Sequence, residues 1–385
     1  MMKKIKEVTV FTIGDSGKIN TWSNVPFFLT ETLIAKGIKV NRVNIDSGLP
    51  FYHQIIHYFA KIFNRATTYG YFRSFTHYNF VRKRIKKAVK QYVNSDLDIF
   101  TTFSFSSIGI TPNPVILLCD WTYDYYIKYF KNRKPDFFEK TSIHRENEQI
   151  RKANLVFSLF PHVTEYMKAY YKNNHIFYLG NVVNSLYQAS EETIQTKKEN
   201  FNLLFIGSNK YIEGVKTLIE AFKNLKQHYP QLLLHIIGID NQEFENLPDD
   251  IFCYGYLDKG VDIERDLYYR LIQQATIFIN TTPKWGAFSA SIEAMYFYTP
   301  IIVTPYKGFL ETFGENINFG CYCEENVSTK IESKIIEILT HSNYAELCIQ
   351  AHHAVKDFTW DAFVDNMITQ IESSAENLLL SRRGD

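Results

Sequence analysis

The chain has 385 residues, with 42 Lys and Arg against 41 Asp and Glu, which gives a formal net charge of +1. This length corresponds to about two domains. A hydrophobic content of 45% and a charged content of 22% are those of an ordinary globular protein and exclude global disorder, collagen and coiled coil. The near-neutral total argues against a dedicated nucleic-acid binder, provided that the charge is evenly spread.

No stretch reaches the roughly 18–20 apolar residues that a membrane span requires. The basic start at residues 1–6 is like that of a signal peptide, but the apolar run at 8–13 is too short for a signal core and predicts a buried strand instead. The cysteine count is odd, at five, and without an export signal it favours reduced thiols in the cytoplasm. No cysteine or histidine cluster has the ligand spacing of a metal site, so we expect no metal.

Continuous apolar runs alternate with amphipathic segments along the chain. In the first half the runs predict strands at 8–13, 40–45, 97–103, 115–119, 155–160 and 176–179, with helices at 26–36, 81–92, 139–152 and 161–171. In the second half we expect strands at 203–206, 232–239, 251–254, 276–279 and 301–304, with helices at 215–227, 264–274 and 290–297. This alternation predicts α/β domains with doubly wound parallel sheets.

The alternation breaks at residues 181–200, which are polar and lack an apolar period. This segment is expected to be a linker between domains at 1–180 and 201–358. One more amphipathic helix is expected within 359–385. In open α/β sheets ligands bind beyond the carboxyl ends of the strands, so the residues just after each strand are the candidates for a site.

The strand at 203–206 leads into a glycine loop, Gly207 to Gly214, and then into a helix. This arrangement is typical of phosphate binding through backbone amides and the helix dipole, and Lys210 adds a cation. The alternative is a plain turn in which Gly207 and Gly214 only bend the chain.

The strand at 276–279 is followed by a second loop of small residues and a helix. Gly286, Ala287, Ser289 and Ala290 allow a ligand to approach the backbone closely. Glu293, in the first turns of an apolar helix, is placed to accept hydrogen bonds from sugar or ribose hydroxyls; alternatively it only faces the helix dipole.

These pieces together resemble the donor domain of glycosyltransferase family 4. The residues concerned are Gly207-x6-Gly214-Val215, Leu218–Phe222, Glu293-Ala294-Met295 ahead of 299–304, and Gly308-x-x-Glu311. Members of that family are retaining enzymes of the GT-B fold, which has two Rossmann-like domains facing a cleft and uses nucleotide-diphosphate sugars. The resemblance covers about 202–311, and it implies that the last helix crosses back to the first domain.

The resemblance implies a role for each matching position. Glu293 would hold the ribose, and Glu293, Lys210 and Trp285 are the expected catalytic residues. The expected donor-binding residues are Gly207, Ser208, Lys216, Gly255, Leu257, Gly286, Ala287, Phe288, Ser289, Ala290, Gly308 and Glu311. The nucleotide-diphosphate sugar, UDP- or GDP-linked, would be a co-substrate, with no other cofactor.

The departures from the family pattern bear on activity. The family's first glutamate falls on Trp285, and its basic pair falls on Ser208 and Glu213. Charge-assisted contacts from cations stabilise a diphosphate leaving group, so nearby lysines, Lys210 and Lys216 among them, would have to replace that pair. A catalytically silent partner protein of the same fold stays open as an alternative.

In the first half, Gly14, Asp15 and Ser16 follow the first strand and Asp120 follows the strand at 115–119. We expect these four residues on the acceptor side of the cleft. The alternative for Asp120 is a helix N-cap. Arg145 and Glu146, on the helix at 139–152, are expected on the surface.

Residues 51–93 contain nine Lys and Arg, no Asp or Glu, and twelve Phe and Tyr, so the charge is not evenly spread. Nucleic-acid binding, an anionic membrane surface and a solvated helix face all fit this pattern. We favour the membrane, because a lipid-linked acceptor would explain it. The overall prediction is a hexosyltransferase of cell-surface polysaccharide biosynthesis, cytoplasmic and peripheral at the inner face of the plasma membrane, which acts on a glycan or lipid-linked acceptor.

Overall fold

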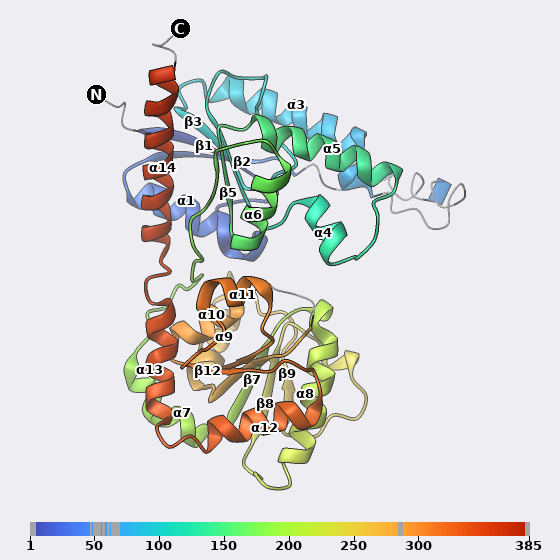
Figure 1. Cartoon of the computed structure of the whole chain (residues 1–385), viewed down its shortest axis with the longest axis vertical. Helices are drawn as coiled ribbons and strands as arrows, with labels where there is room; N and C mark the ends of the chain where they lie inside the picture. Colours follow the sequence, from blue (N-terminus) through green and yellow to red (C-terminus); the bar gives the residue numbers. More distant parts are fainter. Residues whose placement is uncertain are drawn as a thin grey trace. The chain divides into compact units, whose positions relative to one another are not determined.

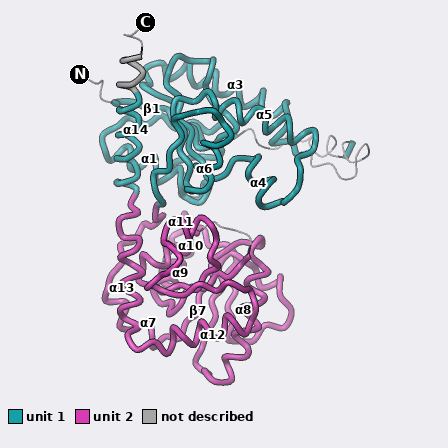
Figure 2. Tube along the Cα trace, in the orientation of Figure 1, with its two compact units in different colours: residues 1–181, 360–385 teal, residues 182–359 magenta. Residues whose placement is uncertain are grey.

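The computed structural model describes residues 5–46, 70–283 and 288–381, together with Gly48, Ile55, Tyr58, Phe59 and Ile62. The chain divides into two compact units, Met1–Asn181 with Trp360–Asp385 (unit 1) and Val182–Thr359 (unit 2), which are coloured separately in Figure 2. Each unit contains a six-stranded sheet, and most helices lie between successive strands in the chain (Figure 1).

The sheet of unit 1 has the order β2-β1-β3-β4-β5-β6, with all neighbouring strands parallel. Its strands are β1 (Glu7–Thr12), β2 (Lys39–Asn44), β3 (Leu97–Phe100), β4 (Val115–Cys119), β5 (Leu155–Ser158) and β6 (Ile176–Tyr178). All six were predicted, because β1, β3, β4 and β5 are buried along most of their length and therefore read as continuous apolar runs. The strand order reverses between β1 and β3, which is where an open sheet forms its ligand crevice.

The helices of unit 1 are α1 (Val25–Ala35), α3 (Phe75–Gln91), α4 (Tyr123–Tyr129), α5 (Phe137–Lys152), α6 (Pro161–Tyr170) and α14 (Trp360–Ser381). The last of these joins unit 1 although it follows unit 2 in the chain. It packs on α1, where Phe28 stacks against Trp360 with ring centroids 6.2 Å apart and Lys36 Nζ lies 2.8 Å from Asp365 Oδ1. Aromatic stacking and an ion pair thus attach α14 to α1 of unit 1.

The sheet of unit 2 has the order β12-β11-β10-β7-β8-β9 and is also parallel throughout. Its strands are β7 (Asn202–Ile206), β8 (Leu233–Ile237), β9 (Ile251–Cys253), β10 (Ile277–Asn280), β11 (Ile301–Val303) and β12 (Gly320–Tyr322). The sequence predicted the first five and missed β12. Gly320 begins that strand because a Cβ there would lie 2.1 Å from the carbonyl oxygen of Ile301. The order reverses between β7 and β10.

The helices of unit 2 are α7 (Ile194–Asn200), α8 (Ile212–Leu225), α9 (Asp262–Gln274), α10 (Ser289–Tyr296), α11 (Lys307–Phe313), α12 (Ser328–Leu339) and α13 (Tyr344–Val355). Helix α7 lies within 181–200, the segment expected to be a linker. Its Ile194 packs into the core of unit 2, and its Lys197 is fully buried. The Lys197 ammonium donates to the carbonyl oxygens of Ile272 and Ala275, at the end of α9, and to Thr299 Oγ1. Part of the expected linker is therefore a packed helix that caps another helix.

Candidate functional site

In unit 2 the loops that follow β7 and β10 meet where the strand order reverses. Gly214, in the first turn of α8, lies so close to the second loop that a Cβ would be 2.3 Å from Thr282 Oγ1 and 3.1 Å from the Thr282 nitrogen. Thr282 Oγ1 in turn donates to the carbonyl oxygen of Tyr211 at 3.4 Å. Only glycine permits this approach. The two loops predicted to bind phosphate therefore lie side by side at the carboxyl ends of the strands of the unit 2 sheet.

Glu293 lies on α10 and is the centre of a buried polar network. Its Oε1 accepts from Lys259 Nζ at 2.5 Å and its Oε2 accepts from the Tyr268 hydroxyl at 2.8 Å. Lys259 also donates to the carbonyl oxygen of Asn184 at 3.2 Å and lies 4.2 Å from the centre of the Tyr268 ring. Burial and the neighbouring Glu293 raise the pKa of Tyr268 far above its usual value, which keeps the hydroxyl protonated as a donor. The Glu293 carboxylate is thus held in one orientation, and its remaining lone pairs can accept further hydrogen bonds.

The expected cationic residues of this edge are exposed. Lys210 and Lys216, on the loop after β7 and on α8, both face solvent, as does Glu213 between them. Glu311 is also exposed and lies 3.7 Å from Lys307 on α11. Ser208, exposed, precedes the short helix at Asn209–Tyr211.

Other predicted donor-binding residues are buried in the core of unit 2 or form part of its helices and turns. The Phe288 side chain is buried and packs on Phe309 at 5.3 Å, so only the backbone of this residue could meet a ligand. Leu257 is buried, and Gly255 has a positive φ of 61° that a side chain would strain. Gly308 lies inside α11, and Ser289 and Ala290 form the first turn of α10. Trp285, Gly286 and Ala287 lie outside the described residues, as does Lys284.

Unit 1 contains a pocket of about 540 Å³ at the carboxyl ends of β1, β3 and β4. Its walls include the aromatic side chains of Trp22, Trp121, Tyr123 and Tyr126, and three charged residues, Arg73, Asp120 and Glu146. The volume is that of a small-molecule site. The position, at the reversal of strand order, is the one expected for a ligand in an open sheet.

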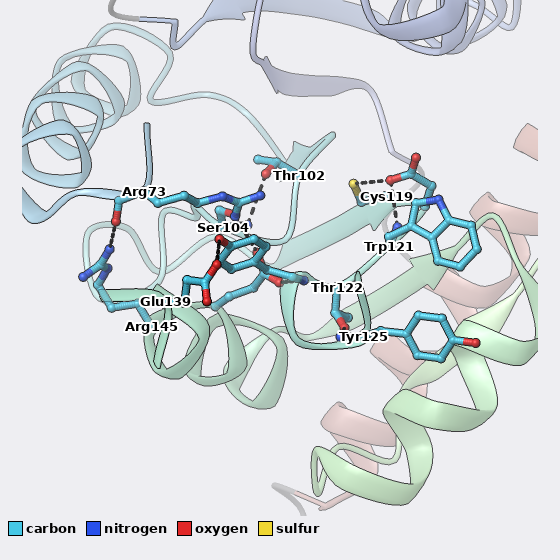
Figure 3. A network of polar contacts seen from close by, with 12 residues as sticks. Arg73, Thr102, Ser104, Cys119, Trp121, Thr122, Tyr125, Glu139 and Arg145 are labelled. Carbon is cyan, nitrogen blue, oxygen red and sulfur yellow. Dashed lines mark hydrogen bonds and ion pairs between the residues drawn. The ribbon is translucent and has the colours of Figure 1, made fainter. Parts of the chain in front are cut away.

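Glu146 organises one wall of this pocket and is buried, in contrast to its predicted surface position. Its carboxylate accepts from the backbone N–H of Tyr123 at 2.5 Å, from Ser104 Oγ at 2.6 Å and from Arg73 at 3.4 Å. The Arg73 guanidinium also donates to Ser104 Oγ at 2.9 Å (Figure 3). It lies over the Tyr123 ring, 4.0 Å from the ring centre. Arg145, half-buried, donates to the carbonyl oxygen of Arg73 at 2.6 Å (Figure 3).

Asp120 ends β4 and is the predicted acceptor-side residue that lines the pocket. Its Oδ1 accepts from the Trp121 backbone N–H at 2.7 Å and from the Cys119 thiol at 3.3 Å. Burial and the adjacent carboxylate raise the pKa of the Cys119 thiol well above its usual value, so Cys119 stays a thiol rather than a nucleophilic thiolate. The helix N-cap considered for Asp120 is instead made by Thr122, which accepts from the N–H of Tyr125 at 3.1 Å.

Trp22 reaches the pocket from a strained turn after β1. Trp22, Ser23 and Asn24 have φ values of 35°, 54° and 71°, three successive non-glycine residues in left-handed conformation. Such backbone is unfavourable for L-residues and is typical of ligand sites. Gly14, Asp15 and Ser16, predicted to lie on the acceptor side, belong to the same loop but are not among the residues that line the pocket. Ser16 is buried, and Asp15 accepts from the N–H of Gly17 in a local turn.

Within the described residues no group of three His, Cys, Asp or Glu side chains is placed to hold a metal ion. No helix of the described part of the chain is long and apolar enough to cross a membrane.

Comparison with known proteins gives a match to a family model over part of the chain and a fold for the whole chain. Residues 187–354 match the sequence model of the family Glycosyl transferases group 1. No curated protein matched. Among solved structures, HepE from Anabaena in complex with UDP and glucose is 14% identical and has a TM-score of 0.64, with 96% of this chain and 100% of that chain covered.

Two further structures agree with this result. Sucrose-phosphate synthase from Thermosynechococcus elongatus is 15% identical, with a TM-score of 0.68 and 98% and 100% of the two chains covered. WaaG, described as a glycosyltransferase involved in lipopolysaccharide biosynthesis, is 15% identical, with a TM-score of 0.62 and 94% and 99% covered. At such identities the likeness concerns the fold, and it confirms the predicted GT-B fold of two Rossmann-like domains.

Proposed function

We propose that the chain is a glycosyltransferase that moves a hexose-type sugar from a UDP- or GDP-linked donor to a glycan or lipid-linked acceptor in cell-surface polysaccharide biosynthesis, with retention of the anomeric configuration. The observation that carries the proposal is the coincidence in unit 2 of two independent features. The Glycosyl transferases group 1 match covers this unit, and the unit's own sheet brings the loops after β7 and β10 together at its reversal of strand order.

In this proposal the nucleotide binds at the carboxyl edge of the unit 2 sheet. The Glu293 carboxylate, oriented by Lys259 and Tyr268, accepts hydrogen bonds from the ribose hydroxyls. The positive end of α10 attracts the negative charge of the diphosphate. Lys210 and Lys216, both exposed, replace the missing basic pair and stabilise the leaving diphosphate electrostatically. We propose that Trp285, which lies outside the described residues, contacts the donor sugar in place of the family's first glutamate.

The acceptor is assigned to the unit 1 pocket. Asp120 is the carboxylate there that can accept a proton or a hydrogen bond from an acceptor hydroxyl. The aromatic walls supply the apolar surface against which a sugar ring packs.

A thermal-shift measurement with UDP, GDP and ADP tests the donor site. One of these nucleotides should raise the melting temperature in a concentration-dependent way, since ligands that bind only the folded state stabilise it by mass action. Glu293→Ala should abolish the shift, whereas Glu220→Ala, an exposed glutamate on α8, should preserve it. If no nucleotide stabilises the wild-type chain, the enzyme proposal fails. A screen of nucleotide sugars for nucleotide release then identifies the donor.

A catalytically silent binding protein of the same fold is the second candidate. The observation that favours it is that Ser208 and the exposed Glu213 occupy the two positions where the family carries cations. A carboxylate at such a position repels the negatively charged diphosphate instead of stabilising it. Nucleotide binding without nucleotide release from any donor and acceptor tested would support this candidate over the enzyme.

We further propose that unit 1 binds an anionic membrane surface through α3. Its buried face consists of His77, Val81, Ile85 and Ala88, and its opposite face exposes Lys83, Arg84, Lys86, Lys87 and Lys90. Phe72, Phe75 and Phe80 are exposed beside these cations, at 47%, 64% and 45%. Exposed lysines and arginines contribute about 1 kcal/mol each near anionic lipid, and aromatic rings settle at the interface. Most of 51–69, the rest of the basic stretch, lies outside the described residues.

Flotation with liposomes tests the membrane proposal. The chain should float with vesicles that contain phosphatidylglycerol and not with pure phosphatidylcholine, and binding should weaken as salt rises. Lys86→Glu with Lys87→Glu should abolish flotation, whereas the matched pair Lys330→Glu with Lys334→Glu on α12 should not. Binding that ignores lipid charge would count against the proposal, and retention of a short DNA or RNA duplex would favour the nucleic-acid alternative.

A further inference from the structure

We infer that the unit 1 pocket binds a sugar that carries an oxyanion, either a carboxylate or a phosphate, and that Arg73 holds this group. The description of the sugar as the acceptor rests on the proposed function. The recognition itself rests on the pocket alone, whose lining residues all belong to unit 1 and to the described part of the chain.

Arg73 presents an open edge of its guanidinium to the pocket. Its side-chain hydrogen bonds within the described residues, to Ser104 Oγ at 2.9 Å and to Glu146 Oε2 at 3.4 Å, both use Nη1. Nε and Nη2 therefore keep three N–H groups, and they form the edge that pairs side-on with two oxygens of a carboxylate or a phosphate. The Arg73 side chain lines the pocket and is 40% exposed, so a ligand can reach this edge.

The guanidinium is held in place before a ligand binds. Its face lies over the Tyr123 ring, 4.0 Å from the ring centre. Tyr123 is itself fixed by its hydroxyl, which donates to Glu139 Oε1 at 3.2 Å. Ser104 Oγ is bonded to both Arg73 and Glu146. A donor that is already oriented loses little conformational freedom when it binds, which reduces the cost of binding.

The charged groups around Arg73 leave one cation in excess. Glu146 is offset by Arg73, and Glu139 is offset by Arg133, which donates to its two carboxylate oxygens at 2.7 Å each. Arg145 donates to the carbonyl oxygen of Arg73 at 2.6 Å and has no carboxylate partner among the described residues. Burial lowers the pKa of Arg145, and the positive charge of Arg73 lowers it too. An oxyanion bound to Arg73 would offset this repulsion between the two guanidinium groups.

The rest of the pocket suits a sugar ring. Trp121 is fixed by ring contacts with Phe130 and Phe160, each at 4.6 Å, and a pyranose packs its apolar C–H surface on such a ring. Figure 3 shows Arg73 and Trp121 on opposite sides of the view, so they would contact different ends of a ligand. Asp120, whose Oδ1 accepts from the Trp121 N–H at 2.7 Å, lies at the Trp121 end, away from the oxyanion. The pocket volume of about 540 Å³ is large enough for one or two sugar units.

The test is direct binding to the full-length chain, followed by tryptophan fluorescence and by calorimetry at constant ionic strength. The probes are methyl glycosides of neutral hexopyranoses, the corresponding hexuronides and the corresponding hexoside phosphates. At least one anionic probe should bind about tenfold or more tightly than its neutral counterpart, the size of effect expected for a charge-assisted pair. This preference should fall as salt rises. The comparison of uronide with phosphate shows which of the two oxyanions the pocket takes.

Variants of Arg73 assign the preference to its guanidinium. Arg73→Gln should reduce the preference to about twofold or less, because the amide keeps a donor without the charge. This variant leaves the Glu146 carboxylate buried without its cation, so the double variant Arg73→Gln with Glu146→Gln, which removes both charges, is measured beside it and should lose the preference equally. Arg151→Gln, at an exposed arginine of α5, should keep the preference.

Two results would overturn the inference. One is a wild-type chain in which neither anionic probe binds more tightly than its neutral counterpart. The other is a folded Arg73→Gln chain, single or double, that keeps the wild-type ratio of affinities.

The outcomes also separate this inference from the proposed function. A preference for an anionic glycoside that depends on Arg73, in a chain that binds no nucleotide, would leave the inference standing and remove the transferase. Nucleotide-sugar turnover in which an anionic acceptor is no better than its neutral counterpart would support the transferase and overturn the inference.

Discussion

Lys259 Nζ lies 2.5 Å from Glu293 Oε1, and both side chains are less than a tenth exposed. Lys259 comes from the loop between β9 and α9 and Glu293 from α10, so tertiary packing brings the pair together. The Tyr268 hydroxyl and the Asn184 carbonyl oxygen complete the network at 2.8 and 3.2 Å. A charged carboxylate can remain buried here because each charge has a partner.

Removing one partner should therefore be costly, and removing both should not. Lys259→Met and Glu293→Gln should each lower the free energy of unfolding by about 3–5 kcal/mol, because each variant leaves the other member of the buried pair without its oppositely charged partner. The double variant should lose at least about 2 kcal/mol less than the sum of the two, as measured by chemical denaturation in a double-mutant cycle. The exposed pair Lys334 and Glu337, 2.7 Å apart, is the control and should show a coupling below about 1 kcal/mol. Additive losses at Lys259 and Glu293 would contradict the interpretation.

Lys197 should make stability depend on pH. Burial lowers the pKa of Lys197 to about 7 from 10.5, so between these values the folded state binds fewer protons than the unfolded state. Its contribution to the free energy of unfolding should then rise with pH from about 7 to 10, by at most about 1.4 kcal/mol per pH unit. Lys197→Met should remove this slope in denaturation series, whereas Lys198→Met, its exposed neighbour, should keep it. An unchanged slope in Lys197→Met would mean that the three carbonyl and hydroxyl acceptors hold the lysine charged.

The parallel sheets could be predicted because their strands are buried and apolar over several residues. Two of the elements that were missed lack that signal. Strand β12 has three residues and begins at a glycine, and α7 buries Ile194 and Lys197 in a segment that is otherwise polar. A lysine on the buried side of a helix is predicted to face solvent by any pattern of hydrophobicity. Here the amine accommodates burial by donating to carbonyl oxygens at the end of α9, which are distant in sequence and leave no trace in the local pattern.

The residues of the candidate sites also differ in whether the sequence carried a signal for them. Glu146 could have been placed on the buried face of α5, because Ile143 precedes it by three residues and Ile150 follows it by four, and both are buried. Asp120 was predicted to lie at a ligand site because it follows a strand, and it lines the unit 1 pocket. Arg73 and Lys259 carried no usable signal, since their partners Glu146 and Glu293 are far away in sequence and are reached through tertiary packing.

Gly214→Ala should separate the two loops of unit 2. The new Cβ would lie 2.3 Å from Thr282 Oγ1 and 3.1 Å from the Thr282 nitrogen, so α8 or the second loop must move. We expect a loss of about 1–3 kcal/mol in stability and a smaller nucleotide-induced thermal shift. Adding Thr282→Ala should restore part of both, because it removes the nearest atom and leaves the backbone contact. A Gly214→Ala chain with wild-type stability and nucleotide response would show that the close approach has no role.

Ser23 holds the middle of the left-handed turn that brings Trp22 to the pocket, with a φ of 54°. Ser23→Gly and Ser23→Ala both remove the hydroxyl, but only glycine relieves the strain, so Ser23→Gly should be more stable than Ser23→Ala by about 1 kcal/mol. Glycine at position 23 also makes the turn more flexible, so the turn can leave the conformation that positions Trp22. Ser23→Gly should therefore bind a sugar acceptor in the unit 1 pocket several-fold more weakly than Ser23→Ala, as measured by tryptophan fluorescence, although it is the more stable of the two. If the glycine variant gains stability and keeps full affinity, the strain serves neither the position of Trp22 nor the pocket.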